Sequence, residues 1–464
     1  MNLLRKKNFQ QLAQRPSTLK KALNAFDLTM LGIGAIIGTG IFVLTGTGAL
    51  TAGPALMVSF VIAALACCFA ALCYAEFASM VPVAGSAYTY AYATLGEIVA
   101  FIIGWDLILE YLLAVSSVSV GWSGYFQSLL DGFGMHLPTM FTGAPGTNPD
   151  GEFTLFNLPA FVIIMLITLL ISIGIKETKR VNNIMVVVKV SVILLFIAVA
   201  IFYVKPAQWS PFMPYGFQGV FTAAATVFFA FIGFDAVASS AEETIQPEKN
   251  LPKGILFSLG ICTVLYIIVS GIMTGVVPFL EFERYIDHPV SAVLKVAGQN
   301  WVSGVIDVGA ILGMTTVMLV MLYGQTRIMF AMSRDGLIPN IFQKVNPKFG
   351  TPFVSTWIFG LISAVLGAFI PLTQLAELVN IGTLSAFILV AISVIVLRKT
   401  EPHLNRAFKC PMVPVVPILA VLFCGFLILN LNPLTWLRFL VWLLIGAVIY
   451  FTYSVKHSKL KDAS

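Results

Sequence analysis

The sequence predicts an all-α membrane protein that crosses a lipid bilayer many times. Of its 464 residues, 58% are hydrophobic and only 10% are charged, whereas soluble domains carry about 25% charged residues. A chain so poor in charge cannot cover a surface that faces water, so most of its surface must face lipid. Apolar runs of about 20 residues, the length that spans the hydrocarbon core as a helix, recur along the whole chain.

Twelve such runs are present. The residues before the first run are polar and basic and lack the cleavage pattern of a secretory signal, so we expect the first run to remain as a helix. The third and eighth runs are longer than the hydrocarbon core requires, which predicts tilted helices. The runs lie near 27–48, 54–78, 97–127, 158–175, 181–204, 217–241, 252–277, 301–331, 352–371, 375–397, 412–431 and 434–455.

Positive charges are divided unevenly between the two sides of the predicted membrane. If the N-terminus is cytoplasmic, Lys205, Arg284, Lys295 and Arg438 fall outside, Lys189 falls within a run, and the other 22 of the 27 Lys and Arg residues fall inside. Because Lys and Arg favour cytoplasmic loops, we expect both termini to be cytoplasmic and the number of spans to be even. The protein is expected to be a multi-pass protein of the cell (plasma) membrane.

The composition also argues against several classes of function. The six cysteines and four histidines form no Cys-x-x-Cys pair and no Cys/His cluster, so we expect neither a metal site nor another cofactor. A membrane enzyme would gather His, Asp or Cys at membrane depth, and a channel would carry a repeated pore loop or a charged ring. Neither pattern is present, and we expect the partners to be lipid and a small molecule, not a nucleic acid.

The first run contains four glycines within nine residues, from Gly32 to Gly40. Glycine in a helix interior costs roughly 1 kcal/mol relative to alanine. Gly32 and Gly34 fit close helix packing as well as they fit a break. For Gly38-Thr39-Gly40 we favour a break in the helix, because irregular backbone at membrane depth is tolerated where it is buried or lines a cavity.

The sixth run is interrupted too, where Gly233 and Asp235 lie in adjacent turns of an otherwise apolar segment. An interrupted pair in corresponding positions of two halves points to a transporter site. We expect carbonyls to be freed near Ile36 and from Phe229 to Ile232, and amides to be freed near Thr39. Freed amides attract a carboxylate and freed carbonyls accept from an ammonium, so the two breaks suit an α-amino acid.

These segments resemble signature sequences of the amino acid–polyamine–organocation (APC) superfamily. The segment Gly34-Ala35-Ile36-Ile37-Gly38-Thr39-Gly40-Ile41-Phe42 resembles its first-helix signature. Residues 231–235, with 242–243 and 250–252, resemble its sixth helix and the loop that follows; residues 324–339 resemble the end of its eighth helix. The match runs in order over nearly the whole chain, and the sixth-helix loop is most similar to bacterial relatives of the cationic amino acid transporters.

The resemblance implies the leucine-transporter-like fold: twelve transmembrane helices in a 5+5 inverted repeat with helices 1 and 6 broken, plus two extra helices. One transporter domain then fills residues 1–464, with repeats at 27–204 and 217–397 and the last two helices at 412–455. The family implies that Thr39 and Gly40 hold the substrate carboxylate and that the carbonyls of Ile36, Phe229 and Ile232 receive its amine. The expected substrate-binding residues are Ile36, Ile37, Gly38, Thr39, Gly40, Phe229, Ala230, Phe231, Ile232 and Met321.

Lys189 lies about two turns into the fifth run, among valines. A charge at a helix centre costs about 2.5–3.5 kcal/mol and indicates function by default, and burial disfavours the charged form of a lysine. Some proton-coupled members of the family place a lysine of this helix where sodium-coupled relatives bind sodium. We expect Lys189 to carry the coupling proton and to bond backbone carbonyls near Gly38; the alternative is a permanently charged lysine that ties the fifth span to the first.

Glu110 and Asp235 complete the expected proton-coupling set. Glu110 lies one turn after Asp106, so the two acids share a helix face and repel each other unless they are partnered or protonated. Glu110 fits a pocket residue and a buried structural acid equally well. Asp235 begins the inner half of the sixth run, where an acid can also simply cap the helix.

Bulky apolar residues around the breaks, Met321 among them, favour a small neutral substrate over arginine. The expected function is secondary active transport, with proton-coupled symport of a small neutral L-amino acid into the cytoplasm by alternating access. Two alternatives stay open: a cationic amino acid (arginine/lysine) transporter, which the family label favours, and an amino acid exchanger. Lys189 is the residue that discriminates symport from exchange.

Overall fold

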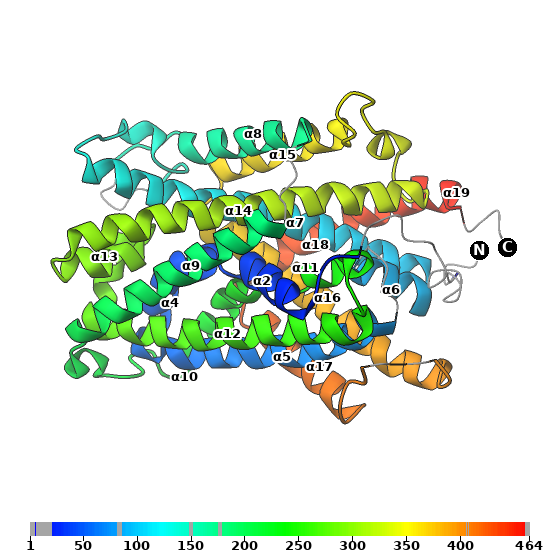
Figure 1. Ribbon diagram of the computed structural model, residues 1–464, viewed down its shortest axis with the longest axis horizontal. Coiled ribbons are helices and arrows are strands. Elements are labelled where there is room, and N and C mark those ends of the chain that lie inside the picture. Colours follow the sequence, from blue (N-terminus) through cyan, green and yellow to red (C-terminus); the bar gives the residue numbers. More distant parts are fainter. Residues whose placement is uncertain are drawn as a thin grey trace.

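The computed structural model describes residues 5, 21–80, 86–147, 152–174, 179–404, 406 and 408–459. These residues are mostly helical and contain no strand, apart from an isolated β-bridge between Leu23 and Thr244. The long helices lie side by side along the long axis of the molecule (Figure 1). The fold class predicted from composition is therefore confirmed as all-α.

Seven helical stretches within the described ranges are long and apolar enough to cross a membrane. The longest single helices are the third and eighth runs of the sequence, as expected, with 36 residues in α7 and 35 in α14. One stretch, Leu44–Met80, combines α4, η1 and α5. The helices concerned are α4 (Leu44–Ala52), η1 (Gly53–Ala55), α5 (Leu56–Met80), α7 (Glu97–Gly132), α9 (Lys179–Ala200), α12 (Pro247–Val276), α14 (Asn300–Arg334), α16 (Leu372–Thr400) and α18 (Pro433–Ile449).

Shorter apolar helices fill the remaining runs. They are α2 (Ala25–Ile36), α8 (Leu158–Ser172), α10 (Gly216–Val227) with η5 (Phe228–Phe231), α15 (Phe353–Phe369) and α17 (Val415–Leu429). Each apolar run of the sequence thus coincides with helix. The two runs predicted to be interrupted give the shortest first pieces, α2 and α10, because each stops at its break.

Short elements connect these helices. The helix α13 lies toward one end of the long axis and α6 toward the other (Figure 1). The short elements are α3 (Thr39–Phe42), α6 (Ser86–Thr94), η2 (Thr139–Phe141), η3 (Ile201–Tyr203), η4 (Pro206–Trp209), α11 (Ala236–Ser239), η6 (Ala241–Glu243), η7 (Phe279–Tyr285), α13 (Pro289–Val296), η8 (Asn340–Gln343), the π-helix η9 (Tyr450–Ser454) and α19 (Val455–His457).

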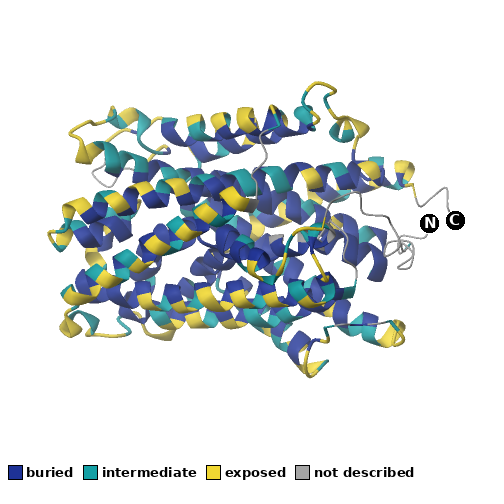
Figure 2. Cartoon of the chain, viewed as in Figure 1, coloured by how far each residue is buried: buried dark blue, intermediate teal, exposed yellow. Residues whose placement is uncertain are grey.

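The outer surface of the helices is apolar. Large hydrophobic side chains such as Phe257, Val264, Leu422 and Leu444 are exposed on α12, α17 and α18. Figure 2 shows such exposed residues along the outer helices, around a buried interior. Large exposed apolar surface of this kind is stable in lipid and not in water, so the protein is a multi-pass membrane protein.

A buried ion-pair cluster joins α5 to the segment after α16. The Glu76 carboxylate accepts two hydrogen bonds from the Arg398 guanidinium, each 2.8 Å long. It also lies 3.2 Å from Arg406 Nε and accepts the Cys410 backbone N–H at 2.7 Å. Bidentate arginine–carboxylate pairs are strong and directional, so this cluster fixes the segment after α16 against α5.

The two described ends of the chain meet at Glu97, the first residue of α7. Its backbone N–H donates to the Arg5 carbonyl at 2.9 Å. Its buried carboxylate accepts from the hydroxyls of Ser458 (2.6 Å), Tyr92 (3.1 Å) and Tyr450 (3.3 Å). Both ends therefore lie at the same end of α7.

Candidate functional site

The first break lies where the glycine cluster predicts it. The helix α2 begins with a reciprocal cap between Asn24 and Asp27 and ends at Ile36. Ile37 is extended, with φ −74° and ψ 104°. The helix resumes at Thr39, after Gly38 at φ −157° and ψ −140°. The first span is thus interrupted as expected, but at Ile37-Gly38, because Thr39 and Gly40 already belong to the next helical piece.

Lys189 occupies the carbonyl side of this break. Its buried ammonium donates to the Gly34 carbonyl at 2.7 Å and to the Ile37 carbonyl at 3.2 Å. These are carbonyls at a helix C-terminus, which carry partial negative charge and lack a full set of intrahelical partners. The contact expected between Lys189 and carbonyls near Gly38 is present.

The amide side of the break begins at Thr39. The first backbone bond of the outer piece runs from the Phe42 N–H to the Gly38 carbonyl, at 3.3 Å. The N–H groups at the start of a helix have no partner within that helix. Thr39 is fixed by its hydroxyl, which donates to the Met314 sulfur at 3.4 Å, and packs against Gly121.

The second break lies between α10 and α11. The α-helix ends at Val227, continues as the 3-10 turn η5, and opens at Ile232, whose ψ is 139°. Gly233 follows with φ +112°, and a Cβ atom there would lie 2.9 Å from the Ala35 carbonyl oxygen. A side chain at this position would be strained and would collide with the first break, so glycine is required there.

Asp235 occupies the N-cap position of α11, but its side chain makes no capping hydrogen bond. The alternative interpretation, that Asp235 serves to cap this helix, is therefore wrong. The inner piece of this span is also shorter than expected, because α11 has only four residues.

The two breaks touch each other through Gly40 and Ala230. A Cβ atom added to Gly40 would lie 2.2 Å from Ala230 Cα and 2.4 Å from Ala230 Cβ. No side chain fits in such a contact. The predicted substrate residues of the first and sixth runs are therefore brought together, although they are nearly 200 residues apart in the sequence.

The helix α14 lies against the first break. A Cβ atom on Gly38 would lie 3.2 Å from Val317 Cγ2. Met314, Val317 and Met321 of α14 are buried and recur at intervals of three and four residues, which places them on one helix face. Met321 thus shares the face that contacts the first break.

Tyr266 of α12 is a site residue that the sequence did not reveal. Its hydroxyl donates to the Ile36 carbonyl at 3.1 Å, and its ring packs against Phe60 and Phe231. The Ile36 carbonyl, expected to receive an amine, therefore already has one donor, although a carbonyl oxygen can accept two. The Phe229 carbonyl accepts from the Ile232 N–H at 3.2 Å.

The acids of the expected proton-coupling set lie near one another. Glu110, Asp106 and Asp235 are buried, and Glu110 is close enough to both aspartates to interact electrostatically. Glu110 and Asp106 lie on α7, and Asp235 lies where the chain resumes after the second break. Lys189, by contrast, contacts the first break.

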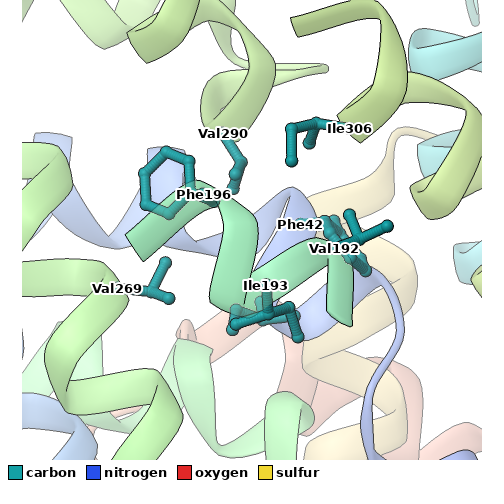
Figure 3. A pocket seen from close by; sticks show the side chains of 8 residues that line it. Phe42, Val192, Ile193, Phe196, Val269, Val290 and Ile306 are labelled. Carbon is teal, nitrogen blue, oxygen red and sulfur yellow. The ribbon is translucent and has the colours of Figure 1, made fainter. Parts of the chain in front are cut away.

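A narrow apolar gap, too tight to seat a water molecule, lies beside the helical piece that follows the first break. Figure 3 shows its side chains, which come from α3, α9, α12, α13 and α14 and include Phe42 beside Val192. Its lining contains no polar side chain and none of the predicted substrate residues. It is a packing gap and offers nothing to bind a charged amino acid. The lining residues are Ile41, Phe42, Val192, Ile193, Phe196, Val269, Val290 and Ile306.

The chain is similar to known permeases over nearly its whole length. The model of a family described as amino acid permease matches residues 23–453. A branched-chain amino acid permease of Bacillus subtilis is 70% identical, with 99% of each chain covered. A methylthioribose transporter of the same organism is 54% identical, again over 99% of each chain. A vacuolar cationic amino acid transporter of Arabidopsis thaliana is 32% identical over 97% of this chain and 94% of its own.

Proposed function

The chain belongs to the amino acid permease family of the APC superfamily, and on this premise we propose that it carries a neutral L-amino acid into the cytoplasm together with a proton. One observation carries the proposal. The Lys189 ammonium donates to the carbonyls of Gly34 and Ile37, at the break after which Thr39 and Gly40 begin a new helical piece.

The proposed architecture is twelve membrane passes in two inverted repeats of five helices, followed by two more helices. The apolar helices are consistent with this count when α2 and α4 are taken together as the first pass and α5 as the second. The lysine and arginine distribution favours cytoplasmic termini in the cell membrane. In this arrangement α2 and α10 begin the two repeats, and the ligand binds where both are interrupted.

The breaks supply complementary groups for the two charges that every α-amino acid carries. The amides at Thr39 and Gly40 suit the carboxylate, because they lie at the positive end of the outer helix piece. The carbonyls of Ile36, Phe229 and Ile232 suit the ammonium. Backbone groups alone then read the invariant part of the substrate, and side chains are left to read the variable part.

Lys189 is the proposed proton carrier. In its charged form it ties α9 to the end of α2 through two carbonyls. Loss of the proton removes that charge and weakens the tie, so the inner piece of the first span is freed to move when the site opens to the cytoplasm. Glu110 and Asp235 are proposed to pass the proton on, because both are buried and their carboxyl groups are close enough to interact electrostatically.

The substrate side chain is proposed to be neutral and aliphatic. The side chains buried around the breaks include Phe231, Ile232 and Met321. None of these residues carries an acid that could form an ion pair with the cationic side chain of a substrate such as arginine. The relative that is 70% identical is named for branched-chain amino acids, which are also neutral. We therefore propose a substrate range that runs from alanine to the branched-chain amino acids.

Exchange of one amino acid for another is the second candidate. The observation that favours it is the direct contact of Gly40 with Ala230. When no substrate is bound, this close packing would oppose the conformational change, so the transporter would change state most readily with an amino acid bound. A cationic substrate is a variant of either mechanism, and it is favoured only by the names of relatives near 30% identity.

The test is uptake into liposomes that contain the purified protein, with labelled alanine, leucine and arginine, and with or without an inward proton gradient. Accumulation of alanine or leucine only with the gradient supports the proposal. Uptake that requires preloaded amino acid and ignores the gradient would identify an exchanger. Unlabelled methylthioribose serves as a negative control. It has neither an ammonium nor a carboxylate, so it should not inhibit amino acid uptake.

A further inference from the structure

The second break has a side chain on its carbonyls, as the first does. Asn380, fully buried in α16, donates through its amide nitrogen to the Ala225 carbonyl at 2.8 Å and to the Thr226 carbonyl at 3.1 Å. These carbonyls lie in the last turn of α10, directly before the 3-10 turn of the break. Asn380 therefore does for the sixth span what Lys189 does for the first.

The two contacts are matched in position. Lys189 lies 155 residues after its acceptor Gly34, and Asn380 lies 155 residues after its acceptor Ala225. Gly34 and Ala225 each stand two residues before the end of their helices, which end at Ile36 and Val227. Equivalent donors from the last helix of each repeat thus reach equivalent carbonyls of the first helix.

The hydrogen bonds that the Asn380 side-chain nitrogen donates hold this side chain in place. Its oxygen has no hydrogen-bond partner among the described residues, whereas both bonds of its nitrogen go to the break. An amide in an apolar span is costly to bury unless it is hydrogen-bonded, so the bonds to Ala225 and Thr226 are what stabilise Asn380 in this position.

We propose that Asn380 is a positioning residue of the substrate site, the uncharged counterpart of Lys189 in the second repeat. It orients the end of α10, and through it the Phe229 and Ile232 carbonyls that receive the substrate ammonium. This inference rests on the proposed function, because it assumes both the repeat and the ammonium site.

The difference in charge between the two donors has a physical reason. With Lys189 already at the first break, a second cation at the other break would add to the repulsion felt by the substrate ammonium across a low-dielectric interior. A neutral amide donates the same number of hydrogen bonds without that repulsion and keeps them at any physiological pH. The first break is then the one that a proton can release, and the second stays fixed throughout the cycle.

The experiment compares Asn380→Leu and Asn380→Asp with wild type in proteoliposomes, with alanine and leucine as substrates. Leucine keeps the branching at Cγ and removes both donors, so we expect KM to rise about tenfold, which corresponds to about 1.4 kcal/mol. The proton-driven accumulation ratio at saturating substrate should stay unchanged, because Lys189 is intact. In Asn380→Asp the deficit should shrink as the pH falls, because a protonated carboxyl regains one O–H donor.

Ser385→Ala is the matched control, since that hydroxyl donates only within α16, to the Ile381 carbonyl. All variants are first checked for monodisperse behaviour and unchanged melting temperature. A KM within twofold of wild type for Asn380→Leu, in folded protein, overturns the inference. So does a deficit in Asn380→Asp that is the same at every pH. If wild type moves no amino acid at all, the proposed function fails and this inference fails with it, which is a different result from normal uptake by Asn380→Leu.

Discussion

The aliphatic stem of Lys189 runs directly across Gly313 of α14. A Cβ atom on Gly313 would lie 3.1 Å from Lys189 Cγ, 3.3 Å from Cε and 3.5 Å from Cδ. One turn earlier, a Cβ atom on Gly309 would lie 2.4 Å from Val192 Cγ2. Small residues let α9 approach α14 closely, and that approach sets how far the lysine reaches toward the first break.

Gly313→Ala should therefore weaken proton coupling without touching the substrate. The added methyl group pushes the lysine stem by a few tenths of an ångström and disturbs its bonds to Gly34 and Ile37. We expect proton-driven accumulation to fall several-fold, roughly the effect of losing one hydrogen bond of 1 kcal/mol, while exchange persists. Gly313→Val places more bulk against the lysine stem and should lower proton-driven accumulation further.

Gly304→Ala on the same helix is the control for Gly313, because no atom lies within 4 Å of its Cβ position. Uptake by both alanine variants is measured with and without a proton gradient, alongside substrate exchange. If Gly313→Ala accumulates substrate as wild type does, the position of Lys189 is not limiting for coupling.

Gly40→Ala should abolish transport. Its Cβ atom would collide with the Ala230 Cα at 2.2 Å, so the two breaks must separate by roughly 1 Å or more to reach ordinary contact. Misplacement of a bound group by 1 Å can cost about a hundredfold. Ala230→Gly cannot restore function, because the clash is with the backbone.

The measurement for Gly40→Ala is substrate binding, read as thermal stabilisation by added alanine or leucine. Gly425→Ala is the comparison, since the space around Gly425 is open. Normal stabilisation of Gly40→Ala by substrate would mean that the contact between Gly40 and Ala230 is not kept in the loaded protein.

Local signals were enough to locate the breaks, and long-range pairing was not. The glycines around Gly38 and the interruption at Gly233 disturb an apolar run, so they are visible in a sequence. The contact of Lys189 with backbone carbonyls was predictable, because a charged group within a membrane span needs a polar partner and few such partners are nearby. Asn380 carried a similar signal, a lone amide in an apolar span, but its polarity does not indicate which of many carbonyls it meets.

Other features depend on packing that no local pattern encodes. Tyr266 lies 230 residues from the Ile36 carbonyl that it contacts. Asp235 was placed correctly at the start of a helix piece, but the alternative role of a helix cap is not observed, because its side chain makes no capping hydrogen bond. The packing around the two breaks likewise follows from helices α7, α12 and α14, whose relative placement the sequence leaves open.

Glu76→Gln should destabilise the fold more than it impairs substrate recognition. The substitution leaves Arg398 and Arg406 without their shared carboxylate, and removing one partner of a buried pair costs about 3–5 kcal/mol. Because Arg398 is partly exposed, we expect the lower end of that range. The readout is the melting temperature in detergent, with the exposed Glu281→Gln as control; equal melting temperatures for the two variants would contradict a stabilising role of the cluster.

His288 should make the outer loop sensitive to acid. It lies between η7 and α13, its ring contacts Tyr125 and Tyr285, and burial, followed by the nearby Lys295 charge, lowers its pKa from 6.5 to about 4. Between these two pH values the unfolded chain binds a proton that the folded chain does not. The stabilisation is therefore complete above pH 6.5 and is lost as the pH falls toward 4, by at most about 1.4 kcal/mol per pH unit.

The melting temperature of wild type should accordingly drop more between pH 7 and pH 5 than that of His288→Gln, which has no group to titrate at this position. His403→Gln, at an exposed position, should follow wild type. The comparison is made in one detergent with intrinsic tryptophan fluorescence, so that other titrating groups contribute equally to all three proteins. A drop in His288→Gln as large as that of wild type would show that acid acts elsewhere, and the packing of His288 against Tyr125 and Tyr285 would then not be what opposes its protonation.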